Sequence, residues 1–171
     1  MCEHAGRLPD AIRAYSAGLA VSPKDAKLLI KRGWALEMGY QHALAQADFT
    51  AAAAVDPDNA EAHSGLGYVQ AVQKLPPDAQ REAELALLHG SESYLVLHNV
   101  ACIYAALSQV VENQGSAYQD VAMALLRRSV KLWKQSGAGP NELDLMKGEP
   151  AFKPMQGRKD FQELLRDGAN G

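Results

Sequence analysis

The sequence has few cysteines, no long apolar run and no excess of basic residues. Two cysteines, Cys2 and Cys102, among 171 residues are too few for a disulfide scaffold and are typical of a reduced cytoplasmic protein. No apolar run approaches the roughly 20 residues that a transmembrane helix requires. The first ten residues also lack the apolar centre of a secretion signal. A net charge of −3 gives no concentrated basic surface for nucleic acid. We therefore expect a cytoplasmic protein that binds neither membranes nor nucleic acid.

Motifs for catalysis and cofactor binding are also missing from the sequence. It has no glycine-rich phosphate loop, no HExxH motif and no GxSxG motif. The five histidines are scattered. His98 and Cys102 would share one face of a helix, where they could bind a metal or tune a thiolate, but the sequence offers no third ligand. The simpler interpretation, which we favour, is that both are groove or core residues. We predict a protein that is not an enzyme and that has no metal or cofactor.

What the sequence does contain is a repeated pattern of small and large residues. Residues 26–57 have the pattern of two antiparallel helices that end at Pro57, and Pro23 ends the preceding unit about 34 residues earlier. Within this unit, Gly33 allows two helices to approach closely, and Phe49 fills the space between successive units. The small positions are Gly33, Ala45 and Ala52, and the large ones are Leu36 and Phe49.

This pattern resembles the tetratricopeptide repeat (TPR), and the Leu66-Gly67 pair falls at the family's paired Leu-Gly position. The resemblance implies an all-α fold, a right-handed superhelix of about 3.5 repeats with a C-terminal helical cap. The array would occupy residues 1–136 and the cap residues 137–171. The array would consist of a partial repeat at 1–23 and repeats at about 26–57, 60–91 and 94–136, the last with an insertion near 109–118.

Register and capping signals predict the individual helices. Asp58 and Asn59 are suited to cap the helix that follows them, and the insertion is expected to lengthen a helix and to bulge at residues 113–116. The predicted helices run over residues 10–21, 26–38, 42–55, 60–73, 78–89, 93–108, 120–134, 141–147 and 159–165.

The first predicted helix lacks its partner, because only residues 1–5 could represent the preceding one. An apolar stripe formed by Ile12, Tyr15 and Leu19 would then lie open, whereas the end of a solenoid normally has a polar cap. An open apolar stripe at this end indicates a truncated fragment, a start codon assigned too far downstream, or a stripe that another chain covers. One form of the last alternative is a homodimer through this helix.

Arg32 departs from the family pattern, which usually has an apolar residue in that position. In register it faces Asp48 across the helix pair, so we predict a salt bridge between them. The alternative is that Arg32 extends its charged end to solvent.

The resemblance implies that the first helix of each repeat lines a concave groove for a peptide or a partner helix. Trp34 and Tyr68 take equivalent places in adjacent repeats and are predicted to stack, either as binding residues or only as space-filling ones. The predicted groove residues are Lys27, Ile30, Lys31, Trp34, Glu37, Ser64, Tyr68, His98, Asn99 and Cys102.

One TPR subclass binds the carboxylate terminus of chaperones through paired lysines and asparagines. Lys27, Lys31 and Asn99 match that pattern, but Ser64 and Tyr68 stand where it requires lysine and asparagine. We therefore do not expect such a clamp. A looser preference for acidic peptides near the two lysines stays open.

The last 35 residues resemble the tail that follows TPR arrays in bacterial serine/threonine kinases. The similarity rests on residues 149–152, 154–156, 160–161 and 164–165, with Gln156 in place of the usual basic residue. Six apolar residues are predicted to cover the last repeat: Leu145, Met146, Phe152, Met155, Phe161 and Leu165. We predict a protein–protein interaction scaffold. The alternatives are an oligomerisation module that docks through the first helix, or the detached regulatory tail of a larger signalling protein.

Overall fold

The computed structural model describes residues 7–169, which form nine α-helices and one 3-10 helix within that range. Residues 1–6 of the predicted partial repeat, with the helix turn expected at 1–5, and the last two residues of the predicted cap lie outside the described residues. None of the helices described has the length and apolar character needed to cross a bilayer. The elements are α2 (Leu8–Val21), α3 (Ala26–Met38), α4 (His42–Val55), α5 (Ala60–Val72), α6 (Pro76–Gly90), α7 (Tyr94–Leu107), α8 (Gly115–Ser136), α9 (Glu142–Gly148), η1 (Pro150–Met155) and α10 (Lys159–Ala169).

Short polar residues fix where several of these helices begin. The side chains of Asp25, Asn59, Ser93 and Asn141 each accept a hydrogen bond from a backbone N–H in the first turn of α3, α5, α7 and α9. These bonds satisfy backbone donors that have no partner within the helix. The first helix of each successive pair therefore begins at a cap that is visible in the sequence.

The helix bounds agree with the sequence prediction at α3 and α4, and they differ most at α8. This helix begins at Gly115, whereas the prediction placed its start at residue 120. The insertion therefore adds more than a turn to α8. Asn113 has a positive φ of 67° in the connecting loop, but Gly115 and Ser116 are helical and do not form part of the predicted bulge.

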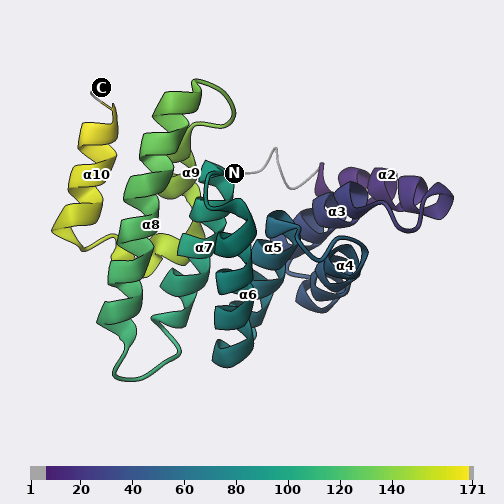
Figure 1. Cartoon of the computed structure of the whole chain (residues 1–171), viewed down its shortest axis with the longest axis horizontal. Helices are drawn as coiled ribbons and strands as arrows, with labels where there is room; N and C mark the ends of the chain where they lie inside the picture. The colour runs from purple at the N-terminus through teal and green to yellow at the C-terminus, as the bar shows by residue number, and fades with distance from the viewer. Residues whose placement is uncertain (1–6, 170–171) are drawn as a thin grey trace.

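Successive antiparallel pairs, α3–α4, α5–α6 and α7–α8, stack side by side along the long axis of the molecule (Figure 1). Helix α5 contacts both α3 and α7, so the first helices of the pairs form one row. This arrangement is an all-α helical-repeat solenoid. Its core is a chain of apolar clusters between neighbouring pairs rather than one central cluster.

Phe49 is the centre of the first cluster. Its ring is fully buried between α3 and α5, at the positions of Gly33 and Gly65. A Cβ atom added at Gly33 or Gly65 would lie 2.9 or 2.4 Å from the ring. The two glycines thus make room for one phenyl ring between two adjacent helices.

The predicted salt bridge between Arg32 and Asp48 is confirmed. The guanidinium donates two hydrogen bonds of 2.7 Å, from Nε and Nη2, to the two carboxylate oxygens, and the Asp48 side chain is 8% exposed. Arg32 Nη1 also donates to Ser16 Oγ of α2 at 3.1 Å. The Asp48 carboxylate raises the pKa of Arg32, so this contact holds three helices together through a permanent charge.

The apolar stripe of α2 is less open than the sequence predicts. Leu19 is 7% exposed and belongs to the first core cluster, Ile12 packs against the same cluster, and Tyr15 is half-buried. Helix α3 lies along α2 and covers much of the face that was expected to be free. The part of α2 that remains exposed and apolar includes Val21, at 84% exposure.

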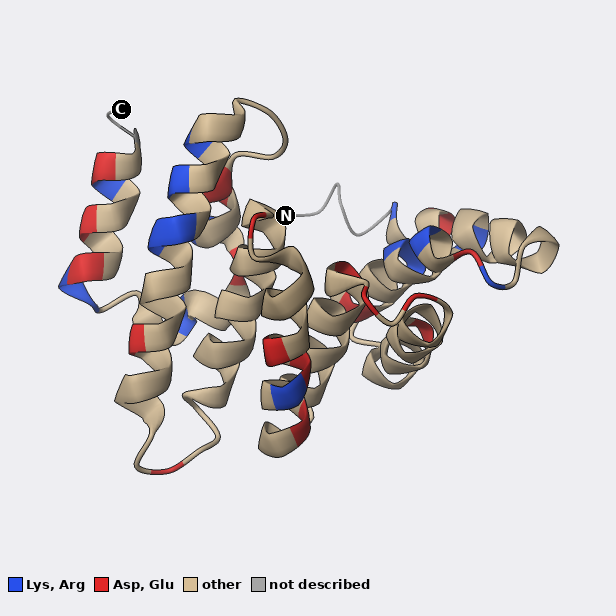
Figure 2. Ribbon diagram, in the orientation of Figure 1, with Lys and Arg blue, Asp and Glu red and all other residues tan. Residues whose placement is uncertain are grey.

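The C-terminal segment packs on the last helix pair. Met146, Phe152, Met155 and Phe161 are buried in one cluster with residues of α7 and α8, whereas Leu145 and Leu165 are half-buried. Element η1 lies against α7, on the row of first helices. Two surface salt bridges join this segment to α8: Asp160 of α10 pairs with Arg127, and Arg158, the residue before α10, pairs with Asp120. Figure 2 shows charges of both signs along these two helices.

Candidate binding groove

A hollow of about 460 Å³ lies on the row formed by α3, α5 and α7. Six of the predicted groove residues line it: Trp34, Glu37, Tyr68, His98, Asn99 and Cys102. The C-terminal segment forms one side of the hollow through Pro140, Leu145 and Glu149. We call this hollow the groove pocket.

Two aromatic rings form one wall of the groove pocket. The ring centroids of Trp34 and Tyr68 are 6.2 Å apart and the planes are tilted by 38°, so the rings of adjacent helix pairs are neighbours, but they are tilted and not stacked as the sequence predicts. Trp34 also meets Phe49 edge-on at 5.1 Å. Both Trp34 and Tyr68 are half-buried, and each therefore has one side in the core and one side toward the pocket.

Carboxylates give the groove pocket its charge. Glu37, Glu61 and Glu149 line it, and no lysine or arginine does so among the residues that the structure describes. Burial, reinforced by the charge of Glu149, raises the pKa of Glu37 to about 7. The Tyr68 hydroxyl donates a long hydrogen bond of 3.4 Å to Glu149 Oε1. The lining of the pocket is therefore acidic, and the basic group beside Glu37 is the imidazole of His42, whose Nδ1 lies 3.7 Å from Glu37 Oε1.

His98 and Cys102 form the floor, and the C-terminal segment fixes the orientation of the histidine. His98 Nδ1 lies 3.0 Å from Glu142 Oε1 of α9, and Ser129 Oγ of α8 lies 2.8 Å from the same oxygen and 2.8 Å from the Tyr94 carbonyl. The ring of Phe152 packs edge-on against the imidazole. Burial, with the charges of Glu149 and Glu142, raises the pKa of the Cys102 thiol well above its usual range.

Four predicted groove residues lie elsewhere. Lys27 and Lys31 are exposed and do not line the groove pocket, and Ile30 is buried in the first core cluster. Ser64 is fully buried, where it accepts a hydrogen bond from Asn99 Nδ2 at 3.3 Å. The two lysines are therefore not placed to give the pocket a preference for acidic ligands.

Sequence reasoning missed Glu142 and Glu149. Both belong to the segment that was assigned a covering role only, and both approach α7 from about 45 residues further along the chain. No pattern within either segment indicates this contact. The one indication in the sequence was Glu142, a charged residue on the same side of the predicted helix at 141–147 as the apolar residues Leu143 and Met146.

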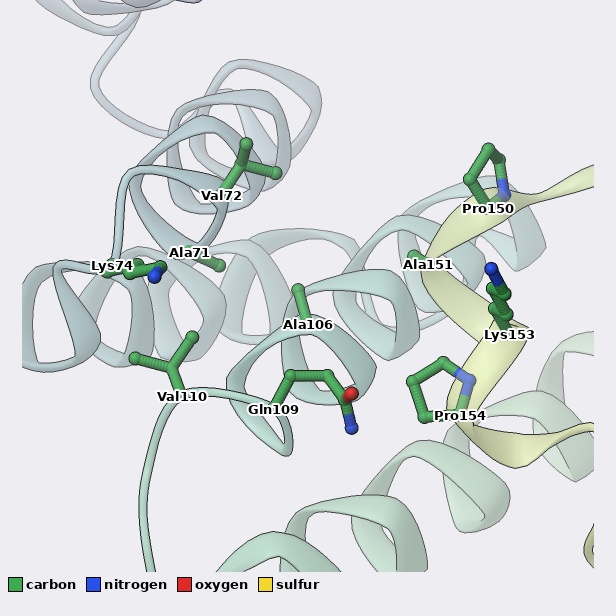
Figure 3. A pocket seen from close by; sticks show the side chains of 10 residues that line it. All are labelled: Ala71, Val72, Lys74, Ala106, Gln109, Val110, Pro150, Ala151, Lys153 and Pro154. Carbon is green, nitrogen blue, oxygen red and sulfur yellow. The ribbon is translucent and has the colours of Figure 1, made fainter.

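A second hollow, of about 490 Å³, lies where the C-terminal ends of α5 and α7 meet η1. Figure 3 shows Lys74 and Lys153 at opposite sides of it, with Ala106 and Gln109 between them. Its lining is mostly apolar, and its two charged residues are both basic. The row of α3, α5 and α7 therefore has two hollows: the acidic groove pocket, which Glu149 lines, and this basic hollow, which η1 lines.

No family model and no curated protein matches the sequence. Among solved structures, the crystal structure of MamA, a TPR-containing protein, superposes with a TM-score of 0.55 over 98% of this chain and 90% of the MamA chain. The two chains share a TPR-like fold. At 15% sequence identity the likeness shows the fold alone. It does not test the resemblance to kinase tails, which stays a prediction.

Proposed function

We propose that this protein is an interaction scaffold that binds a partner segment along the row of α3, α5 and α7, and that the groove pocket accepts a basic side chain of that partner. The observation that carries the proposal is the combination of Trp34 and Tyr68 with carboxylates at Glu37 and Glu149 that form no salt bridge with a lysine or arginine among the described residues. The basic group beside Glu37 is the imidazole of His42, whose Nδ1 lies 3.7 Å from Glu37 Oε1. Aromatic faces attract cations, and carboxylates form charge-assisted hydrogen bonds with guanidinium and ammonium groups.

The raised pKa of Glu37 supports this proposal. Burial, and to a lesser extent the charge of Glu149, makes the ionised form of Glu37 unfavourable, and a cation placed beside these carboxylates would stabilise that form. A lysine or arginine of a partner would offset both the burial cost and the repulsion on binding. The pocket is thus better suited to a basic segment than to the acidic peptide that Lys27 and Lys31 suggested.

The alternative role, oligomerisation through α2, has less support from the described residues. Leu19 is buried and Ile12 packs on the chain's own core, so two members of the proposed contact stripe are already occupied. A homodimer through this helix would have to use the remaining exposed part of Tyr15 and its neighbours.

The test is binding of the purified chain to an array of synthetic peptides of about twelve residues with systematically varied charge. We expect bound peptides to contain lysine or arginine and to lose affinity with added salt. Glu37→Gln and Glu149→Gln should weaken this binding, whereas Glu163→Gln, the same change at an exposed position of α10, should not.

Trp34→Ala is the second test, with unfolding curves as a check on the fold. Loss of binding is expected, because the aromatic wall is removed. The proposal is wrong if the array selects acidic or uncharged peptides, or if the charge variants and the Trp34→Ala variant bind the selected peptides as tightly as the native chain.

A further inference from the structure

Three chemically different ligand atoms converge on the floor of the groove pocket. A ring nitrogen of His98, the sulfur of Cys102 and a carboxylate oxygen of Glu149 all lie within 4.8 Å of one another. His98 and Cys102 project from successive turns of α7, and Glu149 is the residue before η1. Across residues 7–169, these three form the one cluster of this kind. Nitrogen, thiolate sulfur and carboxylate oxygen are the ligands that zinc takes in proteins.

The hydrogen bonds behind His98 are those that a metal-binding histidine requires. Glu142 is fully buried, and its Oε1 lies 3.0 Å from His98 Nδ1 and 2.8 Å from Ser129 Oγ. The single hydroxyl proton of Ser129 is shared between this oxygen and the Tyr94 carbonyl, which is also 2.8 Å away. A proton held on Nδ1 by Glu142 leaves the lone pair of Nε2 free for a ligand. A carboxylate that orients a histidine through its other ring nitrogen recurs behind zinc-binding histidines.

The carboxylates around the floor of the groove pocket also favour a bound cation. Glu142 Oε2 is buried without a hydrogen-bond partner in the described structure, and no lysine or arginine forms a salt bridge with Glu142 there. A buried, incompletely paired carboxylate is costly unless a positive charge lies nearby. Glu149, and Glu37 when it is ionised, add negative charge on the pocket side. A divalent ion bound to His98 would compensate all three carboxylates at once.

We propose that His98, Cys102 and Glu149 bind a zinc ion, with the fourth coordination position open to the groove pocket. In a tetrahedral site with bonds of about 2.0–2.3 Å, neighbouring ligand atoms are roughly 3.3–3.8 Å apart, so the ligand atoms need to approach one another by at most about 1.5 Å on binding. Glu149 is half-buried and lies in the link between α9 and η1, where a small movement is feasible. The thiol of Cys102 loses its proton to solvent as the metal binds.

This site shares Glu149 with the proposed function, but it is tested separately from it, because the purified chain should bind the metal with no peptide present. With the metal bound to Glu149, a peptide would contact the rim formed by Trp34, Tyr68 and Glu37. The open position faces that rim, so a metal-bound water, or a donor atom of a partner, would occupy it.

The experiment is a titration of the metal-free chain with Co²⁺, a spectroscopic substitute for Zn²⁺, followed by competition with Zn²⁺. We expect one equivalent to produce a thiolate-to-cobalt charge-transfer band and the visible bands of tetrahedral cobalt, both abolished by zinc. Cys102→Ser should remove the charge-transfer band. The matched control, Cys2→Ser, should leave it unchanged.

Two isosteric variants keep the test independent of any folding defect in Cys102→Ser. Glu149→Gln should weaken cobalt binding through the loss of a ligand. Glu142→Gln should weaken it by about 10–100-fold through loss of histidine orientation. The proposal is overturned if the native chain gives no charge-transfer band, if the band depends on Cys2 instead of Cys102, or if both glutamate variants bind cobalt as tightly as the native chain.

Discussion

Replacement of Gly65 by alanine tests how the helix pairs stack. The added Cβ would lie 2.4, 2.6 and 2.6 Å from three carbons of the Phe49 ring, far closer than ordinary van der Waals contact. The ring has little freedom to move away, because it is fully buried and meets Trp34 edge-on on another side. Either Phe49 must leave its position, or α4 and α5 must separate.

The expected cost follows from two opposing contributions. Overpacking a core by one methyl group costs about 1–3 kcal/mol, and a clash this short lies at the upper end of that range. Alanine recovers about 1 kcal/mol through its higher helix propensity. We therefore expect Gly65→Ala to lower the free energy of unfolding by about 2 kcal/mol. With a urea dependence of roughly 2 kcal/mol per molar, the unfolding midpoint falls by about 1 M.

Urea unfolding followed by far-ultraviolet circular dichroism measures this shift. The control is Gly148→Ala, since a Cβ at Gly148 meets nothing within 4 Å and the midpoint should stay or rise slightly. In a Phe49→Leu background, Gly65→Ala should cost less than in the native chain, because the two changes act on one contact. Equal midpoints for Gly65→Ala and Gly148→Ala would refute the reasoning.

Three further predictions concern charged groups. Asp48→Ala should lower the free energy of unfolding by about 2–3 kcal/mol, because it leaves the half-buried Arg32 guanidinium without its carboxylate partner. The double variant with Arg32→Met should recover part of this loss. Urea unfolding measures both. The pKa of Glu37 is about 7, against an ordinary 4.5, so the protonated side chain stabilises the fold fully below pH 4.5, and this stabilisation is lost as pH rises through 7. Glu37→Gln should abolish the loss. The measurement is the difference in Tm between pH 5 and pH 8, which should be smaller in the variant. For the same reason, the affinity for a basic peptide should increase as pH rises from 6 to 8, and this increase should be weaker in Glu37→Gln, as measured by fluorescence anisotropy.

Much of the fold was predictable because its signals are local. The helix start at Asn59 follows from capping chemistry, and the positions of Gly33 and Phe49 follow from the repeat register. The Arg32–Asp48 pair was also predictable, since the register of two adjacent helices places these residues opposite each other. In each of these cases, the interacting residues lie within one repeat or between adjacent repeats.

The composition of the groove pocket was not predictable in this way. Register placed Trp34 and Tyr68 side by side, but it also assigned Lys27 and Lys31 to the groove, and these residues lie outside the pocket. Whether a residue on the first helix of a pair faces the pocket depends on how far the C-terminal segment extends over it. The C-terminal segment is not a repeat, so the repeat register does not predict its path.

The sequence by itself determined that the chain is all-helical, where most of its helices begin, and which residues fill the space between them. These features depend on propensity, capping and periodicity, which act over a few residues. The tertiary structure alone decided that Glu142 and Glu149 lie beside His98 and Cys102. That contact joins segments about 45 residues apart in the sequence, and it exists only because the apolar residues of η1 and α9 are buried against α7 and α8.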